Sequence, residues 1–398
     1  MGDSPKASGS RLPSPFSPPS EPRIRKRRGS SKSSGAYGSD ESYSSRPKLG
    51  RYGGDHVSNW NTSQLESFGI FYDVKATELS ELYKSALEKM YSWAVGNTAF
   101  LTKLLQIKEV LIESTKKCMH SLDVDEDFEM ENLRLPGIIE ETKKCMQTMA
   151  KIKEEMSLKF GSAASSDNLS RDLYSIWFTG ISEYVQYYSD LIKELNSEGR
   201  GGVEGQFSQL LTFFSKIFLM NPTRGDASQK VQMTLNGIET TSVPDLRYRM
   251  QGDLSVGNIA SLVTVSVGEV KTCLPVAYGE KTTTDFNITK WKFRNQSVER
   301  LLGQHGGELL VETKKSVIAD TNLGIICVKT MIIFTHLDWE KGHLVCLKYG
   351  TKVDDKRSNI HYSKPYNFLV RKEREEILDT MFNLGLLCRV RSLLTYQE

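Results

Sequence analysis

Val243-Pro-Asp245-Leu-Arg-Tyr-Arg-Met-Gln-Gly-Asp253 is followed, after a short gap, by Ser261-Leu-Val-Thr-Val-Ser-Val-Gly-Glu269-Val-Lys271. The first segment predicts a polar strand that begins with an acid, and the second predicts an apolar strand that ends in Glu-x-Lys. The intervening Gly257-Asn258 is a favourable turn sequence, so the two strands are expected to form a hairpin. Two carboxylates and a lysine would then lie together at one end of that hairpin.

The strand period decides which acid joins the Glu-x-Lys end. Side chains alternate along a strand, so Glu269 and Lys271 are expected on one face. A turn midway between the strands pairs Glu269 with Asp245 or with its neighbour Leu246. Asp253 would need a poorer turn sequence, so Asp245 is the favoured first acid and Asp253 the second candidate. Charges at the edge of a buried face are costly unless they pair or bind a metal.

Composition divides the chain into three predicted parts. Residues 1–58 are rich in Ser, Pro, Gly and charge, so we expect a disordered basic tail. Residues 59–198 show apolar residues at helical spacing and predict a helical module. Residues 199–398 predict a second domain that combines strands and helices, so the fold class is α+β. The run Arg23-Ile-Arg-Lys-Arg-Arg28 is interpreted as a nuclear localisation signal or as a phosphate-binding tail.

The second domain has several predicted elements beyond the central hairpin. Asn236-Gly237 between two short apolar runs is a strong hairpin signal. The remaining expected elements are a helix from about 203 to 219, a helix from about 296 to 311, a long apolar strand pair from 323 to 335, a hairpin partner for it from 343 to 349, and a terminal helix from 369 to 394.

Composition and motifs also weigh against several classes of protein. Six scattered cysteines without a C-x-x-C pair predict neither a zinc site nor a disulfide framework, and favour a reducing compartment. The most apolar stretch, residues 323–337, is too short to span a bilayer, so no membrane association is expected. Gly303-Gln-His-Gly-Gly307 lacks the Lys-Ser/Thr of a phosphate-binding loop.

Pro244-Asp245 together with Glu269-Val-Lys271 resembles the bipartite signature of the PD-(D/E)xK nuclease superfamily. The predicted order of helix, three strands, helix and strand is similar to the common core of that superfamily. The helix after Glu-x-Lys often carries a glutamine in the family, and Gln304 matches it best. The resemblance covers about residues 200–365, and in style it is closest to Crinkler-like or mobile-element-associated members. It also suggests a glutamate from the first core helix, for which Glu204 is the nearest match.

The resemblance implies a restriction-endonuclease-like mixed β-sheet core flanked by helices, and hydrolysis of phosphodiester bonds in nucleic acid, with DNA favoured. Asp245 and Glu269 would hold Mg²⁺ (or Mn²⁺), with help from the backbone carbonyl of Val270. Lys271 would orient or help to deprotonate the attacking water and stabilise charge on the phosphate. Gln304 would position the water or Lys271.

The alternative function belongs to another class, a non-catalytic adaptor in which the nuclease fold is a scaffold. The tail, residues 1–52, has a surplus of seven positive charges, which leaves a net charge of about −4 for the rest of the chain and favours this alternative. In either case the helical module is expected to bind a protein partner or to mediate self-association, and the basic run favours the nucleus over the cytoplasm. Cations that could instead form a nucleic-acid-binding face are Arg247, Arg249, Lys290, Lys292 and Arg294.

Overall fold

The computed structural model describes residues 55–94, 98–124, 138–160, 168–198, 202–225, 229–250, 263–272, 286–293, 297–318, 321–351 and 356–394. Residues 52–398 form one compact unit by their internal contacts. The basic run at 23–28, the second acid candidate Asp253, the turn at 257–258 and Arg294 lie outside the described residues. So does nearly all of the predicted disordered tail, whose last residues form strand β1 (Asp55–His56) and the start of the short helix η1 (Val57–Asn59).

The centre of the fold, within the described residues, is an eight-stranded mixed sheet. Its strands, from one edge to the other, are β2 (Ile70–Tyr72), β10 (Ser358–Tyr362), β9 (Met331–Asp338), β8 (Thr321–Val328), β7 (Thr264–Lys271), β6 (Leu246–Arg249) and β3 (Pro222–Arg224), with β11 (Tyr366–Asn367) pairing with β9. Strands β7 and β8 are parallel, and helix α8 (Val298–Glu312) connects them. Strand β6 is antiparallel to both of its neighbours, β3 and β7. The predicted α+β class is therefore confirmed.

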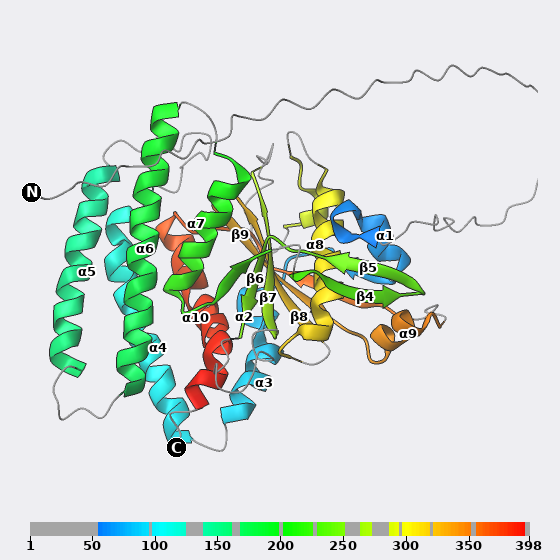
Figure 1. The fold of residues 1–398 in the computed structure, drawn as a ribbon, viewed down its shortest axis with the longest axis horizontal. Coiled ribbons are helices and arrows are strands. Elements are labelled where there is room, and N and C mark those ends of the chain that lie inside the picture. The colour runs from blue at the N-terminus through cyan, green and yellow to red at the C-terminus, as the bar shows by residue number, and fades with distance from the viewer. Residues whose placement is uncertain are drawn as a thin grey trace, which may run out of the picture. The chain divides into compact units, whose positions relative to one another are not determined.

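Helices cover both faces of the central strands (Figure 1). Helices α7 (Glu204–Ile217) and α10 (Arg371–Leu394) lie on one face, and α8 lies on the other. Strand β6 shows how alternation sorts its side chains, because the Tyr248 hydroxyl bonds to Ser215 of α7 at 3.0 Å, whereas Arg247 pairs with Glu312 of α8. The polar residues at odd-numbered positions of β6 and β7 therefore face α8.

Helix α8 is buried on almost every side, and its glycines make this possible. A Cβ on Gly303 would lie 2.2 Å from the Cα of Asn61, and one on Gly307 would lie 2.8 Å from the ring of Trp60. Helix α1 (Thr62–Ser67) and η1 therefore pack directly on the backbone of α8. The glycine-rich sequence that is not a phosphate-binding loop thus has a packing role, which holds α8 firmly over the sheet.

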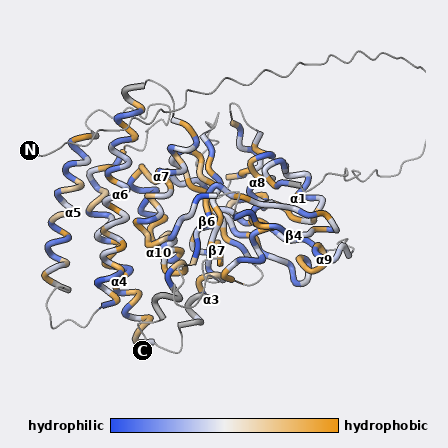
Figure 2. Tube along the Cα trace, viewed as in Figure 1, coloured by the Kyte–Doolittle hydropathy of each residue, from blue (hydrophilic) through white to orange (hydrophobic). Residues whose placement is uncertain are grey.

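The other helices form a layer against α7 and α10. They are α2 (Leu79–Leu82), α3 (Lys84–Ala94), α4 (Thr98–Met119), α5 (Ile138–Phe160) and α6 (Asn168–Glu198), with the short helix η2 (His120–Leu122) after α4. Apolar and polar residues alternate in bands along α5 and α6 (Figure 2), as expected for helices with one buried face. Helix α6 approaches α7 closely, since a Cβ on Gly180 would lie 2.5 Å from the carbonyl oxygen of Lys216.

The predicted boundary near residue 199 separates two parts that share one hydrophobic core. This core includes Trp177 of α6, Phe214 of α7, Leu246 of β6 and Phe382 of α10. Strand β2, which falls inside the predicted helical module, adds to the edge of the main sheet beside β10. Whether residues 59–198 can fold or act as a separate domain stays a prediction.

One element of the second domain was predicted wrongly. Residues His343–Tyr349 form helix α9 between two left-handed glycines, Gly342 and Gly350, and not the strand that pairs with the preceding one. Strand β10 takes that place and pairs with β9 in antiparallel fashion. The apolar run of α9 had the right length for a strand, but the positive φ angles of the flanking glycines favour a short capped helix.

The Asn236-Gly237 hairpin is confirmed, but it belongs to a different sheet. Strands β4 (Val231–Leu235) and β5 (Ile238–Ser242) pair around it, with both turn residues at positive φ, and β1 adds to β5 to form a three-stranded sheet. The third antiparallel strand beside β6 is instead β3, which the sequence did not predict. It begins with Pro222, which is tolerated because β3 is an edge strand.

Candidate active site

The central hairpin has the predicted register. Leu246 pairs with Gly268, and the chain continues so that Asp245 lies opposite Glu269. The backbone N–H of Val270 donates a hydrogen bond of 2.8 Å to Oδ2 of Asp245, which fixes this carboxylate against the end of β7. Asp245 is thus the acid that the structure brings to the Glu-x-Lys end.

Lys271 lies at the centre of the predicted residues. Its Nζ contacts Oε1 of Glu269 and lies 3.7 Å from Oδ2 of Asp245 and 3.7 Å from Oε2 of Glu204. It also donates a hydrogen bond of 3.0 Å to the carbonyl of Val270. Because both carboxylates contact the same nitrogen, Asp245 and Glu269 lie well within the roughly 8 Å that would still let them share one ion. Glu204, from the first turn of α7, joins the group as the resemblance suggested.

Glu308 belongs to the site, and sequence reasoning missed it. It is 1% exposed, and its carboxyl lies close enough to that of the fully buried Glu269 for repulsion between them to raise the pKa of Glu308. Gln304, one turn earlier on α8, donates its amide N–H to Oε1 of Glu308 at 3.3 Å. The signal was the spacing, because residues four apart on a helix share a face. Gln304 therefore reaches the site through Glu308, and its role in positioning the water or Lys271 stays a prediction.

The crowding of acids raises their pKa values. Burial, followed by repulsion from Asp245, raises the pKa of Glu269 from 4.5 to about 8 despite the attraction of Lys271. Burial, followed by repulsion from Glu269 and Asp245, raises the pKa of Glu308 well above its ordinary range. The pKa of Lys271 is also raised, because the attraction of Glu269, Asp245 and Glu204 outweighs a large opposing contribution from burial. At neutral pH the cluster therefore contains a charged lysine, and its two buried glutamates favour the protonated form.

The donor set suits a hard divalent cation. As carboxylates, Glu269 and Glu308 leave buried Oε2 atoms without a hydrogen-bond donor in the described part of the chain. Such oxygens are costly unless a proton or a cation faces them. Carboxylate and carbonyl oxygens are the ligands that Mg²⁺ prefers. Within the described ranges, no three His, Cys, Asp or Glu side chains are already arranged as a metal site, and Lys271 Nζ lies between the acids instead.

The predicted basic residues do not form one face. Arg247 is 1% exposed, and its guanidinium is bound to Glu312 of α8 at 2.7 and 3.1 Å, so it cannot contact a ligand at the surface. Arg249 is partly exposed at the far end of β6, where its Nη2 donates to Gln229 at 2.6 Å. Lys290 and Lys292 are exposed around the short helix η7 (Ile288–Lys290).

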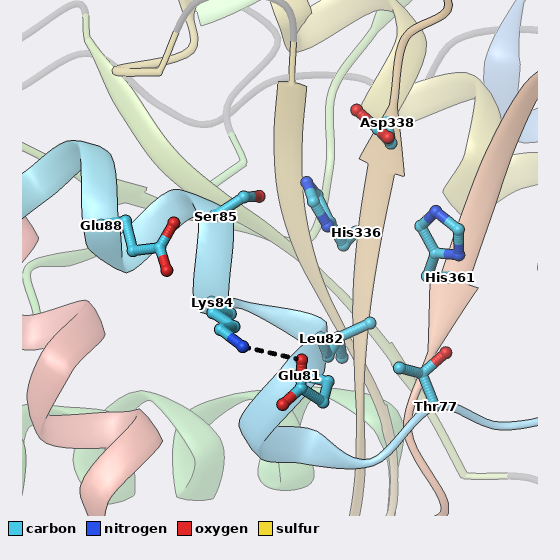
Figure 3. Close-up of a pocket in the computed structure, with 9 residues that line it drawn as sticks. All are labelled: Thr77, Glu81, Leu82, Lys84, Ser85, Glu88, His336, Asp338 and His361. Atoms are coloured by element: carbon cyan, nitrogen blue, oxygen red, sulfur yellow. Dashed lines mark hydrogen bonds and ion pairs between the residues drawn. The ribbon is translucent and has the colours of Figure 1, made fainter.

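A cavity of about 310 Å³ lies elsewhere, between α2, α3 and the strands β9 and β10 (Figure 3). Its polar lining includes His336 and His361, which are cross-strand neighbours, and Asp338. His361 bonds to Asp73 at 2.5 Å, and His336 bonds to Thr321. None of the predicted site residues lines this cavity.

Comparison with known proteins gives no further guide to the family. No protein-family model matches the chain, and neither a curated protein nor a solved structure is similar enough to match it. The resemblance to the nuclease superfamily therefore stays a prediction. Among the helices of the described residues, none is long and apolar enough to cross a membrane.

Proposed function

We propose that the chain hydrolyses phosphodiester bonds of nucleic acid, with DNA as the favoured substrate, in a metal-dependent reaction at Asp245, Glu269 and Lys271. The observation that carries the proposal is the convergence of three carboxylates, those of Asp245, Glu269 and Glu204, and the carbonyl oxygen of Val270 on the nitrogen of Lys271 at the end of β7. A purely structural strand end needs one acid for one lysine. This cluster has more carboxylates than its one lysine can neutralise, and it lies in a buried face of the sheet.

The order of elements around the cluster supports the same proposal. Helix α7, strands β3, β6 and β7, helix α8 and strand β8 occur in this order along the chain, with β4 and β5 of the small sheet between β3 and β6, and β8 is parallel to β7. This is the helix, three strands, helix and strand order that the sequence resemblance implies for a restriction-endonuclease-like core. The acids stand at the β6–β7 hairpin of that core, where the resemblance expects them.

Asp245, Glu269 and the carbonyl of Val270 are the ligands that we propose for Mg²⁺ (or Mn²⁺), with Glu308 as an added acid. A divalent ion bound there would lower the pKa of an attacking water and neutralise charge on the phosphate. The unpartnered buried oxygens of Glu269 and Glu308 are the structural reason to expect a cation.

We propose fewer roles for Lys271 than the sequence alone suggested. Its raised pKa keeps the ammonium charged at neutral pH, so it acts as a hydrogen-bond donor and as an electrostatic stabiliser of the phosphate, and not as a general base. Gln304 orients Glu308, and through it Glu269, by its amide hydrogen bond. Both residues are held on rigid elements, which favours precise positioning.

The alternative is an adaptor protein without catalysis, and one observation favours it. The Lys271 ammonium contacts the carbonyl and the two carboxylates proposed as metal ligands, so the cluster contains a cation of its own. In that function the helices would bind the partner or a second copy of the chain. Helix α5 exposes Ile139, Met146 and Leu158, apolar side chains that suit such a contact. Action in the nucleus is proposed for either function, on the basis of the basic run at 23–28.

The deciding experiment is a cleavage assay with plasmid and single-stranded DNA. The wild type is expected to cleave with Mg²⁺ or Mn²⁺ and to lose activity with a chelator. Lys271→Ala and Glu269→Ala should each lower the rate by about 10²–10⁴-fold, the range for losing a group that acts in the transition state. Glu81→Gln, from the separate cavity, is the matched control and should keep full activity. Equal activity in all variants, or none in any of them, would refute catalysis at this site and favour the adaptor.

A further inference from the structure

A group of cations lies beside the candidate active site, on the same two elements. Arg249 follows Asp245 and Arg247 at alternate positions of β6. Lys314 and Lys315 lie in the short helix η8 (Thr313–Lys315), directly after Glu312 at the end of α8. We call Arg249, Lys314 and Lys315 the basic cluster. The two lysines were not among the residues that the sequence offered as a nucleic-acid-binding face.

Backbone pairing holds the basic cluster in place. Arg249 pairs with Thr264 of β7, and Thr264 also bridges to Ser316, the residue after Lys315. The N–H of Val317 donates to the carbonyl of Thr264 at 2.9 Å. Backbone pairing around Thr264 therefore holds Arg249 and Lys315 close together.

The basic cluster brings three cationic side chains close to one another, with Glu312 nearby. Glu312 is the acid that acts on it, but Arg247 already binds Glu312 in a buried pair. Arg249 and Lys314 donate to neutral acceptors, the side chain of Gln229 and the carbonyl of Gln232. Burial lowers the pKa of Lys315, the attraction of Glu312 raises it, and the charges of Arg247, Arg249 and Lys314 each lower it further. A bound anion would relieve this repulsion.

The spacing fits a polyanion that also reaches the acids. Arg249 is four residues from Asp245 along an extended strand, so the two positions are about 13 Å apart. A duplex presents a phosphate on each strand every 3.4 Å or so along its axis. Because each strand also winds around that axis, its phosphates are farther apart in space than this axial rise, and a strand with one phosphate at the acids would place another, about two positions away, beside the basic cluster.

We propose that Arg249, Lys314 and Lys315 bind the phosphate backbone of a nucleic acid, at a position a few nucleotides from the bond that Asp245, Glu269 and Lys271 cleave. This inference rests on the proposed function for its substrate, but it assigns binding to residues that play no part in the chemistry. Lys and Arg that contact phosphates supply affinity that depends on salt and not on sequence.

The test measures binding without cleavage. A fluorescent duplex of about 30 base pairs is titrated with the full chain in a chelator, between about 50 and 200 mM KCl, and the association constant is plotted against salt on logarithmic axes. The double variant Lys314→Gln/Lys315→Gln should bind more weakly, with a slope shallower by roughly 1.8, since each phosphate contact contributes about 0.9. Lys314→Arg/Lys315→Arg should restore the slope, which excludes a loss caused by misfolding.

Lys143→Gln/Lys144→Gln is the matched control, because it removes two adjacent exposed lysines from α5. Its slope should equal that of the wild type. An unchanged slope in the Lys314/Lys315 variant, an equal fall in the control, or no binding by the wild type would each overturn the inference. Adding Mg²⁺ to the same duplex separates the two proposals. Binding with the expected slopes but without cleavage would refute the proposed function alone, whereas cleavage with unchanged slopes would refute the inference alone.

Discussion

Two charged groups lie one helical turn apart between α8 and the β6–β7 hairpin, and they differ in balance. At Glu312 one buried acid meets one buried arginine, Arg247, at 2.7 Å. At Glu308 the buried acid meets a second buried acid, Glu269, and a lysine that also contacts Asp245. The first group is balanced in charge, although Oε2 of Glu312 and Nη1 of Arg247 have no hydrogen-bond partner among the described residues. The second remains over-acidic, and this imbalance is what distinguishes a candidate site from a structural ion pair.

The comparison predicts opposite responses to loss of charge. In the balanced group, removing one partner leaves an uncompensated buried charge, so the fold is weakened. In the acidic group, removing one acid relieves repulsion, so the fold is not weakened and only function suffers. Repulsion of this kind at a functional site lowers stability, and proteins commonly lose some stability where activity requires it.

The largest effect is expected from Arg247→Met. This change strands the Glu312 carboxylate in the core and should lower the free energy of unfolding by about 3–5 kcal/mol, measured by urea denaturation. The double variant Arg247→Met/Glu312→Leu should recover most of that loss, because it removes both charges. A small loss in the single variant would show that Glu312 finds another partner, and the contrast between the two groups would fail.

The pH dependence of stability should come next in size. The pKa of Glu269 is about 8 in the folded chain and 4.5 as its ordinary value, so between these values the folded form binds the extra proton. Stability from this group is therefore fully present below about pH 4.5 and is lost as the pH rises towards 8, by up to roughly 1.4 kcal/mol per pH unit.

Glu269→Gln provides the measurement of this effect. In a chelator, the difference in unfolding free energy between the variant and the wild type should grow in favour of the variant from pH 5 to pH 8. The comparison with the variant removes the contributions of the other titrating groups. A difference that stays constant with pH, or that grows in favour of the wild type, would contradict the interpretation that the cluster contains an excess of carboxylates.

A moderate effect is expected from Mg²⁺ on stability. At about 10 to 100 times its dissociation constant, the ion should raise the free energy of unfolding of the wild type by roughly 1.4–2.7 kcal/mol. Asp245→Asn should lose this increase, whereas Glu340→Gln, an exposed acid remote from the cluster, should keep it. An increase that is the same in both variants would indicate general binding to an acidic surface.

The smallest effect is expected from Glu204→Gln. The Glu204 carboxylate is half exposed and lies 3.7 Å from Lys271 Nζ, so the pair should contribute less than about 1 kcal/mol to stability. That contribution should disappear in high salt, because exposed charges are screened. A larger loss that resists salt would place Glu204 among the buried acids of the site.

The sequence predicted much of the site because its key geometry is local. Strand alternation and turn position suffice to place Asp245 opposite Glu269, and both belong to one hairpin. Glu308 was missed although it stands four residues after the predicted Gln304. The helix period predicts that Glu308 shares a helix face with Gln304, but it does not predict that this face packs against Glu269.

The fold errors have a similar origin. Strand β3 is short and begins with Pro222, so it has no pattern of its own, and pairing with β6 alone makes it a strand. The run His343–Tyr349 suits a strand or a helix, and the left-handed glycines on either side decide for a helix. Arg247 looked like a surface cation because the sequence contains no sign that Glu312 lies above it.

By itself the sequence determined the α+β class, the helical character of the described parts of residues 79–156, the central hairpin with its register, and the convergence of Asp245, Glu269 and Lys271. These follow from periodicities of two and 3.6 residues and from turn chemistry, which act over short distances along the chain. Tertiary structure alone decided which charges lie close together: Glu308 with Glu269, Glu312 with Arg247, and Lys314 and Lys315 with Arg249. The physical reason is that burial and charge balance depend on how α8 packs across the sheet, and that packing joins residues as many as 65 positions apart.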